Sequence, residues 1–252
     1  MTTRLVLVHG TRVSSTQWRL PAYEEVLAEL DVVTPDLPGH GSRAGEPFTT
    51  EAAVEVLAEA VEGGEPGAPV VLAGHSLGGY MAMAYAGAHP DRLAGLALIG
   101  ASAVPRGPGA AAYRAFASLI PKVGPERMAR LSNRVLTRLT DEETARTVLD
   151  GSDSYEATAD AWAAVMADGD PRLLREVTCP VLLLSGQWDQ LRVHAREFAA
   201  QCRDARVVVV PGATHLLPLS HPRVVATMLR DFAHEVSAPG LRPADSEEGR
   251  ST

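Results

Sequence analysis

Cysteines and long apolar runs are scarce in this sequence of 252 residues. Its two cysteines, Cys179 and Cys202, cannot form a disulfide framework, and neither has metal-ligand spacing to a histidine. The apolar run in residues 1–8 is too short for a signal peptide, and no stretch is long enough to span a membrane. We therefore expect a cytoplasmic protein without a bound metal, and we predict no cofactor.

Positive charge and aromatic residues are also in short supply. Lysine and arginine number 23 against 31 acidic residues, which gives a net charge of −8, and no basic block is present. Nucleic acid is therefore not expected as a partner. Aromatic residues make up 5% of the chain, so nothing indicates a platform for stacking sugars. The hydrophobic share of 46% is ordinary for a globular protein, and the length fits one α/β domain, with or without an insertion.

Six short apolar runs, separated by helical patterns, set the expected architecture. The runs are rich in Val, Leu and Ile and do not alternate with polar residues, which indicates strands buried on both faces of a parallel sheet. Strand alternating with helix predicts an α/β fold with a doubly wound, mostly parallel sheet. The expected strands are 5–8, 31–33, 70–73, 96–99, 181–184 and 207–210, and the expected helices are 22–30, 50–62, 77–88, 194–202 and 221–236.

One interval, residues 102–176, interrupts this alternation with four helical patterns and no convincing strand. An insertion of this kind between two sheet strands predicts a helical cap over one edge of the sheet. We accordingly expect a core made of residues 1–101 and 177–236. The remaining residues, 237–252, are polar with Gly and Pro, which predicts a disordered tail.

The stretch Gly74-His75-Ser76-Leu77-Gly78 places a serine between a predicted strand and a predicted helix. So tight a turn pushes the residue at its apex to a positive φ, and glycines two positions away on either side let neighbouring backbones approach. The turn presents the serine hydroxyl at the carboxyl end of the sheet and at a helix N-terminus, which favours an anion. The alternative is a serine in an ordinary glycine-rich turn, but the strand–turn–helix context favours a nucleophile elbow.

A serine hydroxyl becomes an effective nucleophile when an imidazole takes its proton and an acid orients that imidazole. Asp189 ends the run PVLLLSGQWD, and His215 lies in the loop that follows VVVVP. Both come at the carboxyl ends of predicted strands, and the chain order Ser76, Asp189, His215 fits such a site. We predict Ser76 as the nucleophile, His215 as the base and Asp189 as the orienting acid.

Other histidines and one other aspartate offer alternatives. Asp36 also ends a strand but precedes Ser76 in the chain, so we expect it to shape its own loop. His9 is expected to brace the loop after the first strand, and His75 cannot reach over its own serine. The remaining histidines lie in a turn-rich loop or in or beside helices: His40, His89, His194, His221 and His234.

A tetrahedral oxyanion needs N–H donors, normally from the backbone. We expect one from Leu77, directly after the serine, and one from Thr11 in the loop after the first strand, where Gly10 lets the chain turn. Since the backbone would supply both donors, the identity of the side chain at position 11 is expected to matter little.

These motifs resemble the α/β-hydrolase fold superfamily: HGT after the first strand, DLPGHG after the second, GHSLGG at the elbow, and GQWD and GATH in the late loops. The resemblance covers nearly all of residues 4–236 and implies serine-ester-type chemistry beneath a helical lid. Two departures stand out. The chain begins at the strand that the family usually numbers third, so the N-terminal hairpin is absent, and Arg12 stands where many relatives carry a small or apolar residue.

Serine at the elbow argues against the haloalkane dehalogenases and epoxide hydrolases of this superfamily, which use an aspartate nucleophile. The predicted protein is a serine hydrolase that cleaves a small to medium ester, thioester or lactone through an acyl-enzyme. The same residues would serve a C–C bond hydrolase or a perhydrolase. A non-hydrolytic lyase, cyclase or ligand-binding member of the fold is a further alternative.

The predicted cap should supply selectivity. An apolar stripe in residues 125–139 adjoins a stripe of arginines. Either the apolar stripe packs on the sheet while the arginines extend to solvent or pair with acidic neighbours, or the arginines line an approach for an anionic acyl carrier or a carboxylated substrate. Arg12 either binds a polar group of the substrate or turns outward to a surface acid. The expected partner is a small-molecule acyl substrate, and no oligomeric state is predicted. Candidate pocket walls are Tyr113, Phe116, Met128 and Trp162.

Overall fold

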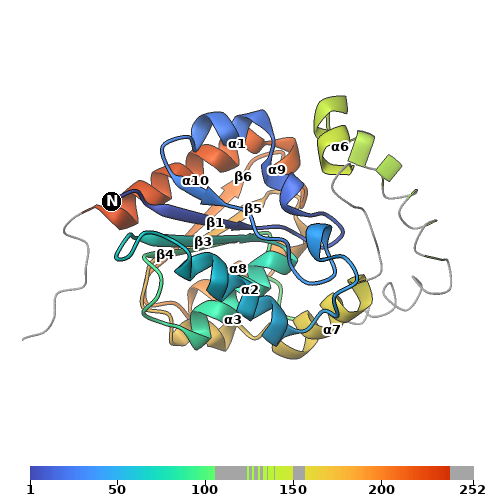
Figure 1. Cartoon of the computed structure of the whole chain (residues 1–252). Coiled ribbons are helices and arrows are strands. Elements are labelled where there is room, and N and C mark those ends of the chain that lie inside the picture. Colours follow the sequence, from blue (N-terminus) through green and yellow to red (C-terminus); the bar gives the residue numbers. More distant parts are fainter. Residues whose placement is uncertain are drawn as a thin grey trace, which may run out of the picture.

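Six parallel strands in the order β2-β1-β3-β4-β5-β6 form the centre of the computed structural model (Figure 1). Each neighbouring pair is parallel, so the described chain crosses over the sheet between paired strands. The strands are β1 (Arg4–Val8), β2 (Asp31–Val33), β3 (Val70–His75), β4 (Gly95–Ile99), β5 (Val181–Gly186) and β6 (Ala205–Val210). The structure describes residues 1–105, 124, 127, 130, 133–134, 136–138, 140–149 and 157–238.

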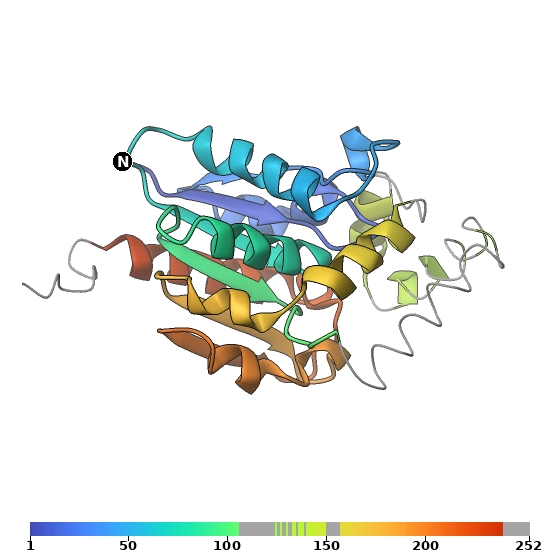
Figure 2. The ribbon, with the colours of Figure 1, turned by 90° about the horizontal axis from the view of Figure 1, so that it is seen from below.

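Helices cover both faces of the sheet (Figures 1 and 2). On one face, α1 (Pro21–Val26) packs against α10 (Pro222–Ser237), with the short α9 (Leu217–Ser220) beside them. On the other face lie α2 (Thr50–Glu62), α3 (Leu77–Ala88) and α8 (Ala195–Ala199). The predicted doubly wound, parallel α/β architecture is confirmed. No helix in the described ranges is both long enough and apolar enough to cross a membrane.

The inner strands explain why the apolar runs did not alternate with polar residues. In β1 and β4, Leu5, Val6, Leu96 and Ile99 are fully buried, because each sheet face is covered by helices. The edge strand β6 differs, since Val207 and Val209 are each 40% exposed. All six predicted runs lie within strands of the sheet.

Helix boundaries depart from the predictions where proline and packing intervene. The predicted helix 22–30 begins at Pro21 and ends at Val26, with Leu27 as its C-cap. The predicted helix 221–236 is preceded by a separate turn of helix, α9, because Pro222 starts α10 as an N1 proline. The predicted helix 194–202 is shorter, at Ala195–Ala199.

Between β4 and β5 the described residues include α6 (Glu142–Leu149), α7 (Thr158–Asp168) and the 3₁₀ helix η3 (Pro171–Arg175), and they include no strand. α7 packs against α3 and α2, and α6 packs against η1 (Ser15–Trp18), a 3₁₀ helix that follows β1. Two further 3₁₀ helices, η2 (Gly41–Arg43) and η4 (Gln190–Arg192), follow β2 and β5. The division into a core, a cap of residues 102–176 and a tail stays a prediction, since much of it falls outside the described residues.

Candidate active site

Ser76 sits at a strained turn between β3 and α3. Its backbone has φ +53° and ψ −117°, a region that residues other than glycine rarely occupy, and its N–H donates to the Ile99 carbonyl at 2.8 Å. A Cβ atom on Gly78 would lie 2.6 Å from the carbonyl oxygens of Val8 and His9, and one on Gly74 would overlap the Gly78 carbonyl. The flanking glycines are therefore required by close backbone contact, and the turn has the form of a nucleophile elbow.

Three side chains from three strand ends meet at this turn. His215 Nε2 lies 3.0 Å from Ser76 Oγ, and His215 Nδ1 lies 3.0 Å from Asp189 Oδ1. An ionised carboxylate can only accept a hydrogen bond, so Nδ1 of His215 carries the hydrogen and Nε2 is left to accept from the serine hydroxyl. Burial alone would raise the pKa of Asp189, but the hydrogen bond from His215, the attraction of that ring when it is protonated, and the hydrogen bond from the Leu191 N–H lower it below its ordinary value. A neutral imidazole poised over a hydroxyl can activate that hydroxyl as a nucleophile.

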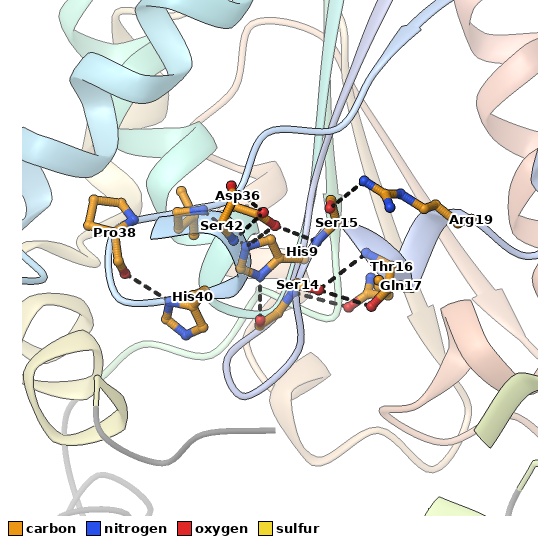
Figure 3. Close-up of polar contacts among 12 residues, drawn as sticks. His9, Ser14, Ser15, Thr16, Gln17, Arg19, Asp36, Pro38, His40 and Ser42 are labelled. Atoms are coloured by element: carbon orange, nitrogen blue, oxygen red, sulfur yellow. Dashed lines mark hydrogen bonds and ion pairs between the residues drawn. The ribbon is translucent and has the colours of Figure 1, made fainter. Parts of the chain in front are cut away.

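Asp36, the other strand-end aspartate, is engaged elsewhere. Its carboxylate accepts the Ser15 N–H at 2.7 Å and both the N–H and the hydroxyl of Ser42 at 2.8 Å (Figure 3). Burial would raise the pKa of Asp36, but these hydrogen bonds hold it below its ordinary value. Asp36 thus joins the loop after β2 to the start of η1, while Asp189 is the carboxylate that contacts His215.

His9 and Gln17 hold the loop after β1 through the Gly10 peptide groups. His9 Nδ1 donates to the Gly10 carbonyl at 2.7 Å, and its Nε2 accepts the Leu37 N–H at 3.0 Å. The Gly10 N–H donates to Gln17 Oε1 at 3.1 Å. Because the Gly10 carbonyl and the Thr11 N–H belong to one planar peptide, the His9 contact fixes the direction of the Thr11 N–H. Figure 3 shows both side chains beside this loop.

His75 links the same loop to the loop that carries His215. Its Nε2 lies 3.0 Å from the His215 carbonyl oxygen, and its Nδ1 lies 3.2 Å from Gln17 Oε1. The two imidazole rings lie 5.0 Å apart. A Cβ on Gly10 would lie 2.9 Å from His75 Nδ1, so only glycine lets that loop pack against the ring. His75 therefore connects the Gln17 side chain, which holds the loop after β1, to the loop that carries His215.

The buried histidines around the site are held neutral. Burial, and next repulsion from His40 when that ring is protonated, lower the pKa of His9 to about 4, and burial, and next repulsion from His215 when that ring is protonated, lower the pKa of His75 to about 3. Burial also lowers the pKa of His40. Protonation of any of these rings would place a positive charge in a buried site, which is energetically unfavourable.

This burial makes the fold sensitive to acid. The unfolded chain binds protons on His9 and His75 near pH 6.5, whereas the folded chain does so only near pH 4 and pH 3, so their stabilisation is complete above pH 6.5 and is lost as the pH falls below it. At about 1.4 kcal/mol per pH unit for each ring, the free energy of unfolding should drop by about 3–4 kcal/mol between pH 7.5 and pH 5. Urea unfolding at the two pH values measures this.

Two variants make that measurement specific. His75→Gln should remove a clear part of the pH-dependent loss, because one of the buried rings whose pKa is lowered is gone. His234→Gln should leave the loss unchanged, because the His234 side chain is 51% exposed and pairs with Glu29 at the surface. Equal free energies of unfolding at pH 7.5 and pH 5 in the unsubstituted protein would contradict the argument.

A pocket opens directly beside Ser76, between α3, α7 and the loop after β1. It is lined by Thr11, Ser76, Leu77, Tyr80, Ala161, Trp162, Val165 and Leu191. The Tyr80 hydroxyl donates to the Ala103 carbonyl at 2.7 Å and accepts the Ala103 N–H at 3.1 Å, so its polar end is occupied. The pocket wall is therefore mainly apolar and suits a hydrocarbon group held near the serine.

The predicted site residues fall into three groups. The structure brings Ser76, His215 and Asp189 together and places Thr11, Leu77 and Trp162 on the pocket wall. Arg12, with a positive φ of 69°, donates from Nη2 to Asn133 Oδ1 at 3.1 Å, which directs it to the segment between β4 and β5. The other predicted pocket walls, Tyr113, Phe116 and Met128, lie outside the described residues.

Several residues of the site were absent from the sequence predictions. Tyr80 lies one helical turn after Ser76, so the four-residue spacing from the elbow could have indicated it. Gln17 carries no such signal: it is fully buried, and only the packing of η1 against the elbow gives its amide a role. Val165 and Ala161 come from a helix far along the chain, and Leu191 from the loop after β5.

Comparison with known proteins gives the family of this chain. Residues 5–228 match the model of the alpha/beta hydrolase family. The chain belongs to the alpha/beta hydrolase family. The resemblance to this superfamily that the sequence motifs indicated is thereby confirmed, and esterases are among the relatives. The pimeloyl-[acyl-carrier protein] methyl ester esterase of Aromatoleum aromaticum is 32% identical over 90% of this chain and 96% of its own length.

Two further similarities of this alpha/beta hydrolase are one that covers a shorter part of the chain and one to a solved structure. Lipase LipV of Mycobacterium tuberculosis is 39% identical over 97 residues, a match that spans 38% of this chain and 36% of the lipase. A thermophilic esterase from Thermogutta terrifontis, solved with malate bound, superimposes with a TM-score of 0.78 at 30% identity over 94% of this chain and 92% of that chain. These similarities support a hydrolase with esterase relatives.

Proposed function

We propose that this alpha/beta hydrolase is a serine hydrolase that cleaves a small to medium ester, thioester or lactone through an acyl-enzyme. The main observation behind the proposal is two consecutive contacts of 3.0 Å each, from Ser76 Oγ to His215 Nε2 and from His215 Nδ1 to Asp189 Oδ1. Ser76 also lines the pocket. Esterase relatives that cover nearly the whole chain support the same reaction class.

Each group has a defined task in the proposed reaction. Ser76 Oγ attacks the substrate carbonyl carbon while its proton passes to His215 Nε2. The carbonyl oxygen becomes an oxyanion, and the N–H groups of Thr11 and Leu77 donate hydrogen bonds to it. His215 then gives the proton to the leaving alcohol or thiol as its bond to the carbonyl carbon breaks, which leaves an ester on Ser76.

Deacylation repeats these steps with water. His215 Nε2 takes a proton from a water molecule, whose oxygen attacks the acyl-enzyme carbonyl through a second oxyanion. Collapse of this intermediate breaks the bond to Ser76 Oγ, and His215 returns the proton to the serine. The Asp189 carboxylate stays ionised throughout, because the hydrogen bond and charge of His215 offset the effect of burial and keep the pKa of Asp189 low.

The pocket supports an uncharged acyl or alkyl group as the part of the substrate nearest Ser76. Its wall is formed by apolar side chains, with Trp162 and Val165 of α7 on one side and Leu77 of α3 on the other. A charged group placed there would lose its hydration without gaining a partner. Charged parts of a substrate would therefore lie toward the entrance.

An anionic acyl carrier is the proposed macromolecular source of such a substrate. The curated relatives named as pimeloyl-[acyl-carrier protein] methyl ester esterases support this choice. Four arginines of the segment between β4 and β5 are exposed and could meet an acidic partner. They are Arg127, Arg130, Arg134 and Arg138.

A substrate panel tests the reaction class. Nitrophenyl esters, acyl-thioesters, lactones, vinylogous diketones and carrier-linked methyl esters are offered to the unsubstituted protein and to Ser76→Ala, and acid release is measured. We expect steady release from esters or thioesters, and none with Ser76→Ala. Turnover confined to diketones would favour a C–C bond hydrolase, and tight ligand binding without turnover would reject the hydrolase.

Arg12 is proposed to help choose the substrate. It follows Thr11, so its side chain starts at the rim of the pocket, and a guanidinium can form paired hydrogen bonds with a carboxylate. Arg12→Ala is expected to raise KM for carboxylated esters about tenfold, equivalent to about 1.4 kcal/mol, and to leave neutral esters nearly unchanged. Steady-state kinetics on matched carboxylated and neutral ester pairs measures the difference.

Asn133 supplies a control for this prediction. Asn133→Ala removes the contact that Arg12 makes with the segment between β4 and β5 but keeps the guanidinium. If Arg12 acts on the substrate, Asn133→Ala should disturb carboxylated esters less than Arg12→Ala does. Equal rises in KM for carboxylated and neutral esters would mean that Arg12 supports its loop only.

A further inference from the structure

One side-chain hydroxyl on the wall of the Ser76 pocket is buried and has no hydrogen-bond partner among the described residues. The Oγ1 atom of Thr11 is inaccessible to solvent, and within the described part of the chain it makes no hydrogen bond. A buried polar group that lacks a partner destabilises a fold, and such groups are rare in native proteins. The unpaired Thr11 hydroxyl therefore calls for a functional explanation.

The polar groups around it are already occupied. The Gly10 carbonyl and N–H are held by His9 and Gln17, and the Ser14 hydroxyl is bonded to that of Thr16. On the pocket wall, the Ser76 hydroxyl faces His215 and the Tyr80 hydroxyl is engaged by Ala103. Among the described wall residues, Thr11 is thus the one whose side-chain hydroxyl has no hydrogen bond.

We propose that the Thr11 hydroxyl is a catalytic donor that gives the oxyanion a third hydrogen bond, beside the backbone N–H groups of Thr11 and Leu77. The inference rests on the proposed serine hydrolase function. Thr11 lines the same pocket as Ser76 and Leu77, so its hydroxyl lies on the residue whose backbone N–H is the proposed oxyanion donor. A threonine hydroxyl can rotate its hydrogen toward an acceptor, and a charged oxygen is a far stronger acceptor than a neutral carbonyl.

This arrangement favours the transition state specifically. In the free enzyme the hydroxyl has no protein partner in the described residues, so no protein hydrogen bond is broken when the oxyanion forms. The new hydrogen bond is strongest when negative charge has developed, and interactions of that kind raise kcat more than they lower KM. The side chain at position 11 then matters, in contrast to the expectation from the sequence that only its backbone is used.

Two substitutions separate the hydroxyl from the shape of the side chain. Thr11→Val has nearly the same volume and no hydroxyl, whereas Thr11→Ser keeps the hydroxyl and loses a methyl group. With a short-chain nitrophenyl ester, Thr11→Val is expected to lower kcat about tenfold with KM changed less than about twofold, and Thr11→Ser to stay within about threefold of the unsubstituted protein. Thr227→Val on α10, remote from the pocket, is the matched control.

Stability gives a readout that a purely structural threonine would not produce. Because Thr11 Oγ1 has no described partner to lose, Thr11→Val should melt at the same temperature as the unsubstituted protein or higher while its kcat falls. An alkyl boronic acid, which forms a tetrahedral adduct with the serine, should bind Thr11→Val about tenfold more weakly. If Thr11→Val does not fold, Thr11→Ala must show the same fall in kcat and in boronate affinity.

Defined outcomes overturn the inference. A kcat for Thr11→Val within twofold of the unsubstituted value rejects it, and so does an equal loss of kcat in Thr11→Val and Thr11→Ser, which would point to packing. Ser76→Ala, measured in the same assay, distinguishes failure of the Thr11 proposal from failure of the proposed serine hydrolase function. Loss of turnover in Ser76→Ala with full activity in Thr11→Val rejects only the role of the hydroxyl, whereas turnover in Ser76→Ala rejects the serine hydrolase itself.

Discussion

Ser76→Ala is expected to lower kcat for ester hydrolysis by about 10⁴-fold or more, with the fold retained. The reason is that no other described hydroxyl contacts an imidazole that is itself held by a carboxylate, as Ser76 Oγ does through His215. Alanine can adopt the positive φ at the elbow as readily as serine can, so the fall in kcat should come from the missing hydroxyl and not from unfolding. Ester hydrolysis and melting temperature, measured together, test this.

Covalent labelling provides a direct second test of the same residue. A fluorophosphonate reacts with a serine that an imidazole has activated, so its mass should appear on the peptide containing Ser76 and on no other peptide. Labelling should disappear in Ser76→Ala. Labelling that persists in that variant would show that another residue is the nucleophile.

The second large effect concerns the partners of the serine. His215→Ala and Asp189→Asn are each expected to lower kcat by about 10³-fold or more, because one removes the proton acceptor and the other permits the wrong tautomer of the imidazole. Asp36→Asn should lower kcat far less, since Asp36 contacts Ser15 and Ser42 and lies outside hydrogen-bond distance of His215 in the described structure. Steady-state kinetics at pH 8 measures all three.

Comparing Asp189→Asn with Asp36→Asn decides which aspartate orients His215. Asp36→Asn also provides the control for general damage, because both aspartates lie in strand-end loops and both accept backbone N–H groups. If Asp189→Asn keeps near-normal turnover while Asp36→Asn does not, the acid has been assigned to the wrong strand. Circular dichroism of each variant separates loss of chemistry from loss of fold.

The sequence by itself determined the architecture and the three reacting residues to be tested. Runs that do not alternate required strands buried on both faces, and parallel strands bring all their carboxyl ends to one edge of the sheet. Ser76, Asp189 and His215 each follow such a run, so their shared edge was fixed before any distance was known. The glycines of the elbow were equally readable, because their need arises from the local turn.

Only the tertiary structure decided which strand-end groups touch. Asp36 and Asp189 occupy similar places in the sequence pattern, but the loop after β5 reaches His215 whereas the loop after β2 closes on η1. Chain order favoured Asp189 as the acid, but the contact itself depends on loop positions to within a fraction of an ångström, which only the folded structure gives.

The scaffold of the site was likewise set by packing between segments distant in the chain. Gln17 contacts the Gly10 peptide and His75 only because η1 folds back against the elbow, and Trp162 reaches the pocket only because α7 packs on α3. The environment of the Thr11 hydroxyl, which makes no hydrogen bond within the described residues, is decided by packing in the same way. Local sequence patterns record which residues a turn or strand needs, whereas these contacts depend on how whole elements pack.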